Sequence, residues 1–214
     1  MSDILFWNVD TQVDFIEPEG RLYVPGAELL KPTWAGLTQT AKDLGIQVVN
    51  TADYHYINSQ EIDKDPDMVK TFPEHCMVGT EGAEFIKETD PEDPTIFEWD
   101  HEYLISNEIA NPGKHRNIVI RKDAFDVFSG NPHTVKILKI IHPETIVVYG
   151  VTTNICVDFA VMNLSKIGNV WVVEDAIKEL PGIPLPFEKW GKRGVKLLTF
   201  DVLCKQLSGK VHLS

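Results

Sequence analysis

The chain has 214 residues, and its 32 acidic side chains outnumber its 20 lysines and arginines, which gives a formal charge of −12. Hydrophobic residues make up 43% of the sequence and charged residues 24%, as is typical of a folded globular protein. This length predicts a single domain over residues 1–214 with a sizeable core. The acidic balance argues against nucleic acids and anionic membranes as partners, because both attract basic proteins.

The cysteine content and the N-terminal segment indicate where the protein resides. Three scattered cysteines are too few for a disulfide framework, so a reducing compartment is the simpler explanation. The first ten residues lack the basic region of a secretory signal, and no apolar run approaches the roughly 18 residues that a membrane span needs. We therefore expect a cytoplasmic protein without a membrane segment.

Short apolar runs alternate with helix-period stretches along the chain. The apolar runs predict strands at residues 4–9, 47–51, 117–121, 145–149 and 169–173 and near Phe200. Helices are predicted over residues 27–44, 132–141, 154–167 and 188–197 and after Phe200. The segment from residue 52 to about 99 is predicted to be irregular, because it is rich in Asp, Glu, Pro and Gly. The alternation predicts an α/β fold, with a parallel sheet covered by helices on both faces.

Polar residues directly after these apolar runs are candidates for a functional site, because parallel sheets bind ligands at the carboxyl ends of their strands. An acid follows the first run, an acid and a histidine the second, and a lysine the third. The fourth run leads through residues 151–154 into a helix that begins near a cysteine. These candidates are Asp10, Asp53, His55, Lys122 and Cys156.

Cys156 has the surroundings of a nucleophile. A cysteine in the first turn of a helix faces the positive end of the helix dipole, and a nearby lysine would favour the thiolate further. A thiolate can attack a carbonyl if another group handles its proton and the oxyanion is held. Asp10 is the candidate for the base, and the N–H groups of Thr152 and Cys156 are the candidates for the oxyanion hole. From spacing alone, Cys156 could equally be a small buried hydrophobe in an apolar helix.

A second cluster of polar residues indicates a metal site. Asp53 and His55 lie two residues apart, His75 follows later, and Glu61 lies between them. Such a mixed nitrogen and oxygen set suits one divalent ion with open water positions, Zn, Fe or Mn. From the residues alone, the alternative is a set of polar loop side chains with ordinary hydrogen bonds.

Five segments resemble a known family. NVDTQVDF, TADYH, FPEHCMVGTEGAEF, IRKDAF and VYGVTTNICV occur in order between residues 8 and 157. Together they resemble the signature set of the isochorismatase-like cysteine hydrolases, and most closely that of nicotinamidases. The resemblance implies a three-layer α/β/α fold with a six-stranded parallel sheet and a catalytic triad of Asp10, Lys122 and Cys156. It also implies a cis peptide between Val151 and Thr152 that aims an oxyanion-hole N–H.

The nicotinamidase branch carries a metal ion, and the resemblance places its ligands at Asp53, His55 and His75. The fourth ligand varies within that branch, and here Glu61 falls at its position, with Ser59 as the competing candidate. In that branch the metal holds the pyridine nitrogen and water, and so orients the ring without attacking it.

The substrate pocket implied by the resemblance is aromatic. Phe15 and Phe72 match the residues that flank the ring, although nicotinamidases often have Trp at the position of Phe72. The segment 123–131, with Phe125, departs from the usual nicotinamidase stretch at a wall of the pocket. Val151 completes the predicted pocket beside the oxyanion hole.

Two further residues near these segments have structural interpretations. Asp14 is predicted to cap local backbone, because it lies close to Phe15 in a turn. Cys76 is adjacent to His75 and could contact the metal, but a buried turn cysteine is the favoured interpretation.

The favoured hypothesis is an amidohydrolase that acts on a small amide, converting nicotinamide to nicotinate and ammonia through a thioester. The alternatives are an N-carbamoyl amidase or an isochorismatase-type hydrolase from a metal-free branch. A catalytically silent binding protein is a further alternative. The sequence leaves the oligomeric state open, a homo-oligomer included.

Overall fold

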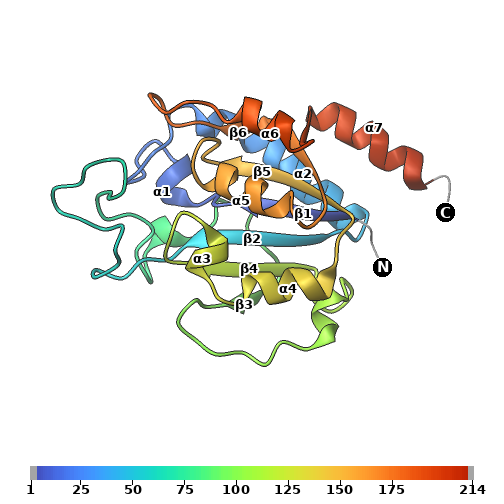
Figure 1. Ribbon diagram of the computed structural model, residues 1–214, viewed down its shortest axis with the longest axis horizontal. Coiled ribbons are helices and arrows are strands. Elements are labelled where there is room, and N and C mark those ends of the chain that lie inside the picture. The colour runs from blue at the N-terminus through green and yellow to red at the C-terminus, as the bar shows by residue number, and fades with distance from the viewer. Residues whose placement is uncertain (1–3, 212–214) are drawn as a thin grey trace.

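The computed structural model describes residues 4–211, so the first three residues of the segment compared with a secretory signal lie outside it. Within this range one parallel sheet is covered by helices on both faces (Figure 1). The predicted three-layer α/β/α architecture is therefore confirmed. The strand order is β3-β4-β2-β1-β5-β6-β7.

The sheet has seven strands within the described range, where six were expected. The additional strand is β3, a three-residue edge strand in the segment predicted to be irregular. Only its last residue is buried, so it has no continuous apolar run by which to recognise it. The strands are β1 (Ile4–Val9), β2 (Gln47–Asp53), β3 (Thr95–Phe97), β4 (Asn117–Lys122), β5 (Thr145–Val151), β6 (Asn169–Lys178) and β7 (Lys196–Leu198).

The predicted helices occur in the expected order but are mostly shorter, and the short helices Val13–Ile16 and Val127–Gly130 were not predicted. The helix predicted over residues 188–197 ends at Lys192, because the chain turns at Gly194, whose φ is 74°, to begin β7. The α-helices are α1 (Val13–Ile16), α2 (Lys31–Asp43), α3 (Val127–Gly130), α4 (Thr134–Ile141), α5 (Cys156–Leu164), α6 (Phe187–Lys192) and α7 (Phe200–Val211). Short 3₁₀ helices cover Ala27–Leu30, Glu81–Ala83 and Asn107–Ala110. Among residues 4–211, no helix combines the length and the apolar character needed to cross a bilayer.

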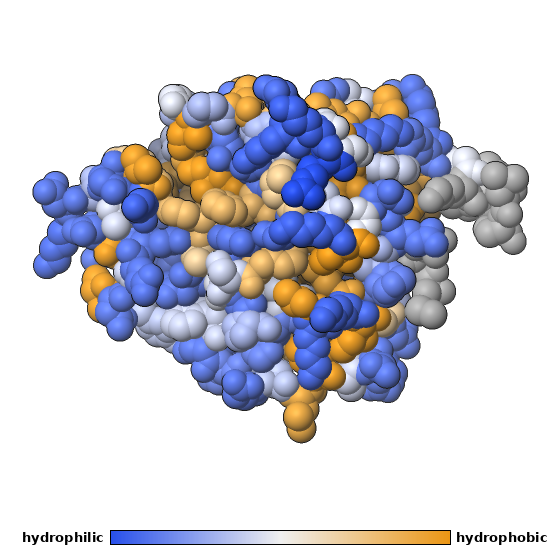
Figure 2. Space-filling view, viewed as in Figure 1, coloured by the Kyte–Doolittle hydropathy of each residue, from blue (hydrophilic) through white to orange (hydrophobic). Residues whose placement is uncertain are grey.

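The central strands are buried on both faces. Every residue of β1, β2 and β5 is buried, as their apolar runs predict. Alternate side chains of β1 enter two separate cores: Phe6 belongs to the core that includes Trp34 of α2, and Trp7 belongs to the core that includes Leu138 of α4. Hydrophilic side chains cover much of the outer face that carries α3, α4 and α5, with hydrophobic ones between them (Figure 2).

Strand register brings the predicted site residues to one edge of the sheet. Val9, at the end of β1, lies opposite Thr51 of β2 and Gly150 of β5. Asp53, at the end of β2, lies opposite Lys122, at the end of β4. The carboxyl ends of the four central strands therefore converge, and the turns that follow them form the walls of one site.

We expect Trp34→Phe to lower the free energy of unfolding by about 2–4 kcal/mol. The Trp34 side chain is fully buried, and its Nε1–H donates to the Ala176 carbonyl at 2.9 Å, so the change removes both packing and a donor. Urea denaturation monitored by circular dichroism measures the loss. Leu29→Ala is the control, because Leu29 is 74% exposed and should change stability by less than about 0.5 kcal/mol. Equal effects of the two variants would contradict the prediction.

Candidate active site

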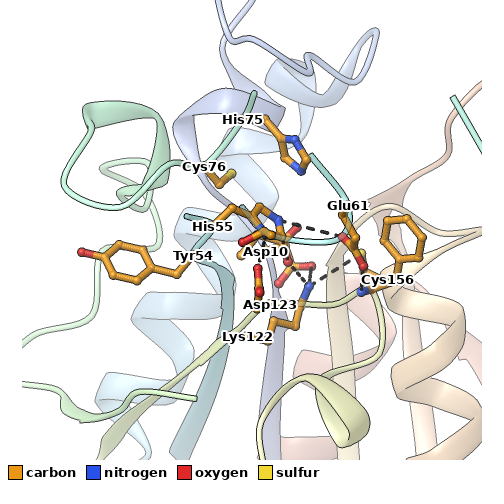
Figure 3. Close-up of polar contacts among 12 residues, drawn as sticks. Asp10, Tyr54, His55, Glu61, His75, Cys76, Lys122, Asp123 and Cys156 are labelled. Carbon is orange, nitrogen blue, oxygen red and sulfur yellow. Dashed lines mark hydrogen bonds and ion pairs between the residues drawn. The ribbon is translucent and has the colours of Figure 1, made fainter. Parts of the chain in front are cut away.

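The acid, the lysine and the cysteine of the predicted triad lie together (Figure 3). Lys122 Nζ is 3.1 Å from Asp10 Oδ2 and 3.9 Å from Cys156 Sγ. A carboxylate oxygen from each of Asp10 and Asp53 and the Cys156 Sγ lie within 4.8 Å of one another. All four side chains are buried. The arrangement places a proton acceptor and a cation within reach of a thiol.

Each triad residue is held by a regular element or its first turn. Asp10 follows β1 in a left-handed conformation with φ of 49°, and its Oδ1 accepts a hydrogen bond from Thr51 Oγ1 at 2.6 Å. Lys122 is the last residue of β4, and Cys156 is the first residue of α5. The side chains are therefore positioned by the sheet and by one helix start.

Lys122 neutralises two buried carboxylates, because its ammonium also forms an ion pair with Asp53. Burial alone would lower the pKa of Lys122, but Asp10 and Asp53 raise it well above its ordinary value. Burial raises the pKa of Asp10 against the opposing effect of Lys122. For Asp53 burial acts in the same direction, but Lys122, His55 and His75 outweigh it and lower the pKa. Asp10 is thus the carboxylate better suited to accept a proton.

The pKa of the Cys156 thiol depends on burial as well as on the groups that the sequence predicts to surround it. The helix start and Lys122 predict a favoured thiolate, but burial raises the pKa of the thiol well above its ordinary value. Lys122 opposes this shift, whereas the negative charges of Asp10 and Asp53 add to it. Burial therefore opposes the thiolate that the helix start and Lys122 favour.

The turn between β5 and α5 has the features expected of an oxyanion hole. The peptide bond between Val151 and Thr152 is cis, as the family resemblance implies. Cys156 begins α5, so its N–H is one of the first amides of the helix, which have no intrahelical acceptor. Thr152 and Cys156 both line the same cavity. The two amides predicted for the oxyanion hole therefore belong to residues that line one cavity, between the end of β5 and the start of α5.

The predicted metal ligands form a buried group. One oxygen of Asp53 and one ring nitrogen from each of His55 and His75 lie within 4.8 Å of one another. His55 Nε2 lies 3.9 Å from both Asp53 Oδ1 and Glu61 Oε2. His55 Nε2 and Glu61 Oε2 are buried and find no hydrogen-bond partner within residues 4–211. Buried polar atoms need partners, and a divalent cation would supply one to both. The donor set fits a metal ion.

The contacts of Glu61 and Ser59 distinguish the two candidates for the fourth ligand. Ser59 Oγ accepts the backbone N–H of Tyr56 at 2.9 Å and so belongs to a local turn. Glu61 Oε1 accepts the N–H of Phe125 at 2.7 Å, which leaves Oε2 facing His55. Burial and the Asp53 charge raise the pKa of Glu61 to about 7. A cation in this position would favour the charged carboxylate, so the geometry favours Glu61 as the ligand.

The predicted pocket residues line one cavity together with Cys156. Phe72 and Phe125 meet edge to face with ring centroids 5.6 Å apart, and the Phe15 ring lies 5.5 Å from the His75 ring. Among the described lining residues, His75 is the only one that can carry a positive charge. The lining residues are Phe15, Leu22, Asp53, Phe72, His75, Phe125, Val151, Thr152, Ile155, Cys156 and Leu180. The cavity suits a small, flat and uncharged molecule.

Three supporting residues had no role assigned from the sequence. The Gln12 side chain makes two hydrogen bonds to the backbone of Asp53. Its Oε1 accepts the Asp53 N–H at 2.8 Å, and its Nε2 donates to the Asp53 carbonyl at 2.7 Å. Thr51 donates to Asp10, and Asp123 pairs with His55 Nδ1 at 2.7 Å. Asp123 had a signal in the sequence, since it directly follows Lys122 at a strand end. Gln12 and Thr51 act through tertiary contacts that no local pattern predicts.

Asp14 has the structural position that its place in the turn predicts. Its two carboxylate oxygens accept the backbone N–H groups of Arg21 at 3.0 Å and Cys76 at 2.7 Å. Gly82 passes so close that an added Cβ would lie 2.2 Å from Asp14 Oδ2. The Cys76 side chain is buried, and its Sγ lies 3.7 Å from the Gly82 carbonyl oxygen. Asp14 thus holds the turn that presents His75.

Comparisons with known proteins agree with this geometry. The family model described as Isochorismatase domain matches residues 5–182. No curated protein matches the chain. A pyrazinamidase of Pyrococcus horikoshii in complex with zinc is 24% identical, with a TM-score of 0.70 over 92% of this chain and 99% of that one.

Two other solved structures have a similar fold. An N-carbamoylsarcosine amidase from Thermoplasma acidophilum is 24% identical, with a TM-score of 0.69 over 94% of this chain and 98% of that one. PnC1 from L. infantum, in complex with nicotinate, is 23% identical, with a TM-score of 0.68 over 92% of each chain. At these identities the similarity establishes the fold alone.

We expect Glu61→Gln to weaken zinc binding by at least about tenfold and Ser59→Ala to leave it unchanged. Glutamine keeps an acceptor for the Phe125 N–H but removes the negative charge of the oxygen that faces His55. Titration of metal-free protein with zinc against a competing chelator measures the dissociation constant. A weaker affinity in the serine variant, with normal affinity in the glutamine variant, would show that Ser59 is the ligand.

Proposed function

This chain belongs to the isochorismatase family of hydrolases, and we propose that it is a cysteine-dependent amidohydrolase acting on a small uncharged amide, with nicotinamide as the best candidate. The observation that carries the proposal is the position of Cys156. Cys156 lines a largely apolar cavity, and its Sγ lies within 4.8 Å of carboxylate oxygens of Asp10 and Asp53. A buried thiol beside a base and a cation is an arrangement for nucleophilic attack.

The first half of the reaction forms a thioester. Asp10 accepts the Sγ proton as Cys156 attacks the amide carbon, and the carbonyl oxygen becomes an oxyanion. The N–H groups of Thr152 and Cys156 hold that oxyanion. Asp10 then returns its proton to the amide nitrogen, the C–N bond breaks, and ammonia leaves. Lys122 stabilises the carboxylate and the developing thiolate throughout.

The second half releases the acid. Asp10 takes a proton from a water molecule that attacks the thioester carbon, and the same two N–H groups hold the second oxyanion. The C–S bond then breaks, and the thiol regains a proton from Asp10. The raised pKa of Asp10, caused by burial, suits a group that accepts and returns a proton in each half-reaction.

A divalent metal is part of the proposal, held by Asp53, His55, His75 and Glu61. The bound ion would supply a Lewis acid to a ring nitrogen of the substrate. The protein's own residues position the substrate around it. The Phe15, Phe72 and Phe125 rings exclude water and confine a flat ring between them, so that its amide carbon faces Cys156.

The cavity lining supports an uncharged substrate over an anionic one. An anionic substrate such as isochorismate would need a basic group in the cavity, and Lys122 is already paired with Asp10 and Asp53. A pyrazinamidase with zinc and a nicotinate complex among the similar structures support an aromatic amide. The similar N-carbamoylsarcosine amidase keeps N-carbamoyl amides as the second candidate. The free thiols suit a cytoplasmic enzyme.

Ammonia release across a panel of amides tests the proposed activity. The panel contains nicotinamide, pyrazinamide, an N-carbamoyl amino acid and a simple aliphatic amide, with protein loaded with Zn, Fe or Mn. We expect nicotinamide or pyrazinamide to have the highest kcat/KM, because most of the lining residues are aromatic or apolar and none of them is a lysine or an arginine. A preference for the N-carbamoyl compound would instead identify the protein as an N-carbamoyl amidase. No turnover of any amide would favour the silent binding protein.

We expect Cys156→Ala to abolish turnover while leaving substrate binding and stability nearly intact. Alanine removes the nucleophile but opens little space at the cavity edge. Steady-state ammonia release measures turnover, and isothermal titration with the best amide of the panel measures binding. Cys204→Ala is the matched control, because Cys204 lies in α7, far along the chain from the site residues, and should retain full activity. Retained turnover in the Cys156 variant would disprove the thioester mechanism.

A further inference from the structure

Asp123 directly follows the catalytic lysine but has no part in the proton transfers. It lies in the turn after β4, and its Oδ1 is 2.7 Å from His55 Nδ1 (Figure 3). The His55 ring is fully buried, whereas the Asp123 side chain is 18% exposed. The contact therefore joins an inner ligand of the site to a carboxylate at its outer wall.

The chemistry of a carboxylate decides which nitrogen of His55 carries hydrogen. A carboxylate can only accept a hydrogen bond, so Nδ1 must donate, and in the neutral imidazole the lone pair then lies on Nε2. Nε2 faces Asp53 and Glu61 and has no hydrogen-bond partner in the described part of the chain. Asp123 thus presents the free lone pair of His55 to the interior of the metal-ligand group.

His75 also has its Nδ1 beside a hydrogen-bond acceptor, but this acceptor belongs to the backbone. Its Nδ1 lies 2.8 Å from the Pro73 carbonyl, which also only accepts. That acceptor belongs to the backbone and stays in place whatever the side chain. Of the two histidines, only His55 depends on a side-chain acceptor, and that acceptor is charged.

We propose that Asp123 is a positioning residue that holds His55 with Nε2 toward the metal and thereby sets the metal affinity of the site. The inference rests on the proposed metal site. Partners of this kind orient a ligating histidine and make it a stronger donor, and their loss typically weakens metal affinity about 10–100-fold. The backbone supports the role, because Tyr54 N–H donates to the Lys122 carbonyl at 3.0 Å and links the two strand ends.

The test measures zinc affinity in two variants. We expect Asp123→Asn, which keeps the shape and an uncharged acceptor, to raise the zinc dissociation constant about tenfold. Asp123→Ala, which removes the acceptor, should raise it by up to about 100-fold. Metal-free protein is titrated with zinc against a chelator of known affinity. Melting temperatures of the metal-free proteins show whether the variants keep their fold, since a merely structural role would lower stability and leave the affinity of folded protein unchanged.

The chain contains a matched control. Asp100 pairs with His101 Nδ1 at the same 2.7 Å on an exposed surface, so Asp100→Asn and Asp100→Ala should leave zinc affinity within about twofold of the unaltered protein. A dissociation constant within twofold in either folded Asp123 variant would overturn the inference and leave the proposed function standing. Failure of the unaltered protein to bind zinc would overturn both the inference and the proposed metal site.

Discussion

The site depends on one interaction, the pairing of the buried Lys122 ammonium with two carboxylates. The lysine side chain is 1% exposed and lies between the carboxylates of Asp10 and Asp53, which are themselves inaccessible to solvent. Two carboxylates this close and this dry could not both stay charged without a cation, because burial penalises each charge and the charges repel. Asp10 belongs to the proposed proton transfers and Asp53 to the proposed metal group. One lysine therefore joins the two halves of the site.

The same lysine leaves its two partners unequal, and the inequality fits their proposed roles. Burial raises the pKa of Asp10 and the charge of Asp53 adds to the shift, whereas for Asp53 the effect of Lys122, with smaller effects of His55 and His75, outweighs burial and lowers the pKa. Two neighbouring carboxylates whose pKa values are pushed apart commonly divide into one that exchanges a proton and one that stays charged. Asp10 and Asp53 are the same type of residue, so the difference between the proposed base and the proposed metal ligand comes from their surroundings.

The sequence predicted what depends on strand ends and on residue chemistry. An acid, a lysine and a cysteine after three apolar runs were expected at one edge, and they lie there because parallel strands converge at that edge. The sequence could not predict properties that depend on burial. The upward shift in the pKa of Cys156 is an example, because a helix start and a lysine are visible locally whereas the cost of burial and the number of nearby carboxylates are not. The edge strand β3 was missed because a half-exposed strand of three residues has no periodic signal.

The segment predicted to be irregular contains all four proposed ligands, and three of them, His55, Glu61 and His75, lie beyond the end of β2. Backbone pairing fixes the position of this part of the chain. His55 donates its N–H to the Cys76 carbonyl at 3.0 Å and accepts the Val78 N–H at 2.9 Å, so the returning chain pairs beside the end of β2 as a strand would. Glu61 likewise pairs with Phe72, whose N–H donates to the Glu61 carbonyl at 2.7 Å. Because backbone pairing fixes the register of the two paired segments, these contacts hold the loop residues in defined positions relative to the sheet, although the region has no helices or long strands. A long segment between two strands can therefore hold ligands in place, provided that its backbone is paired where the ligands project.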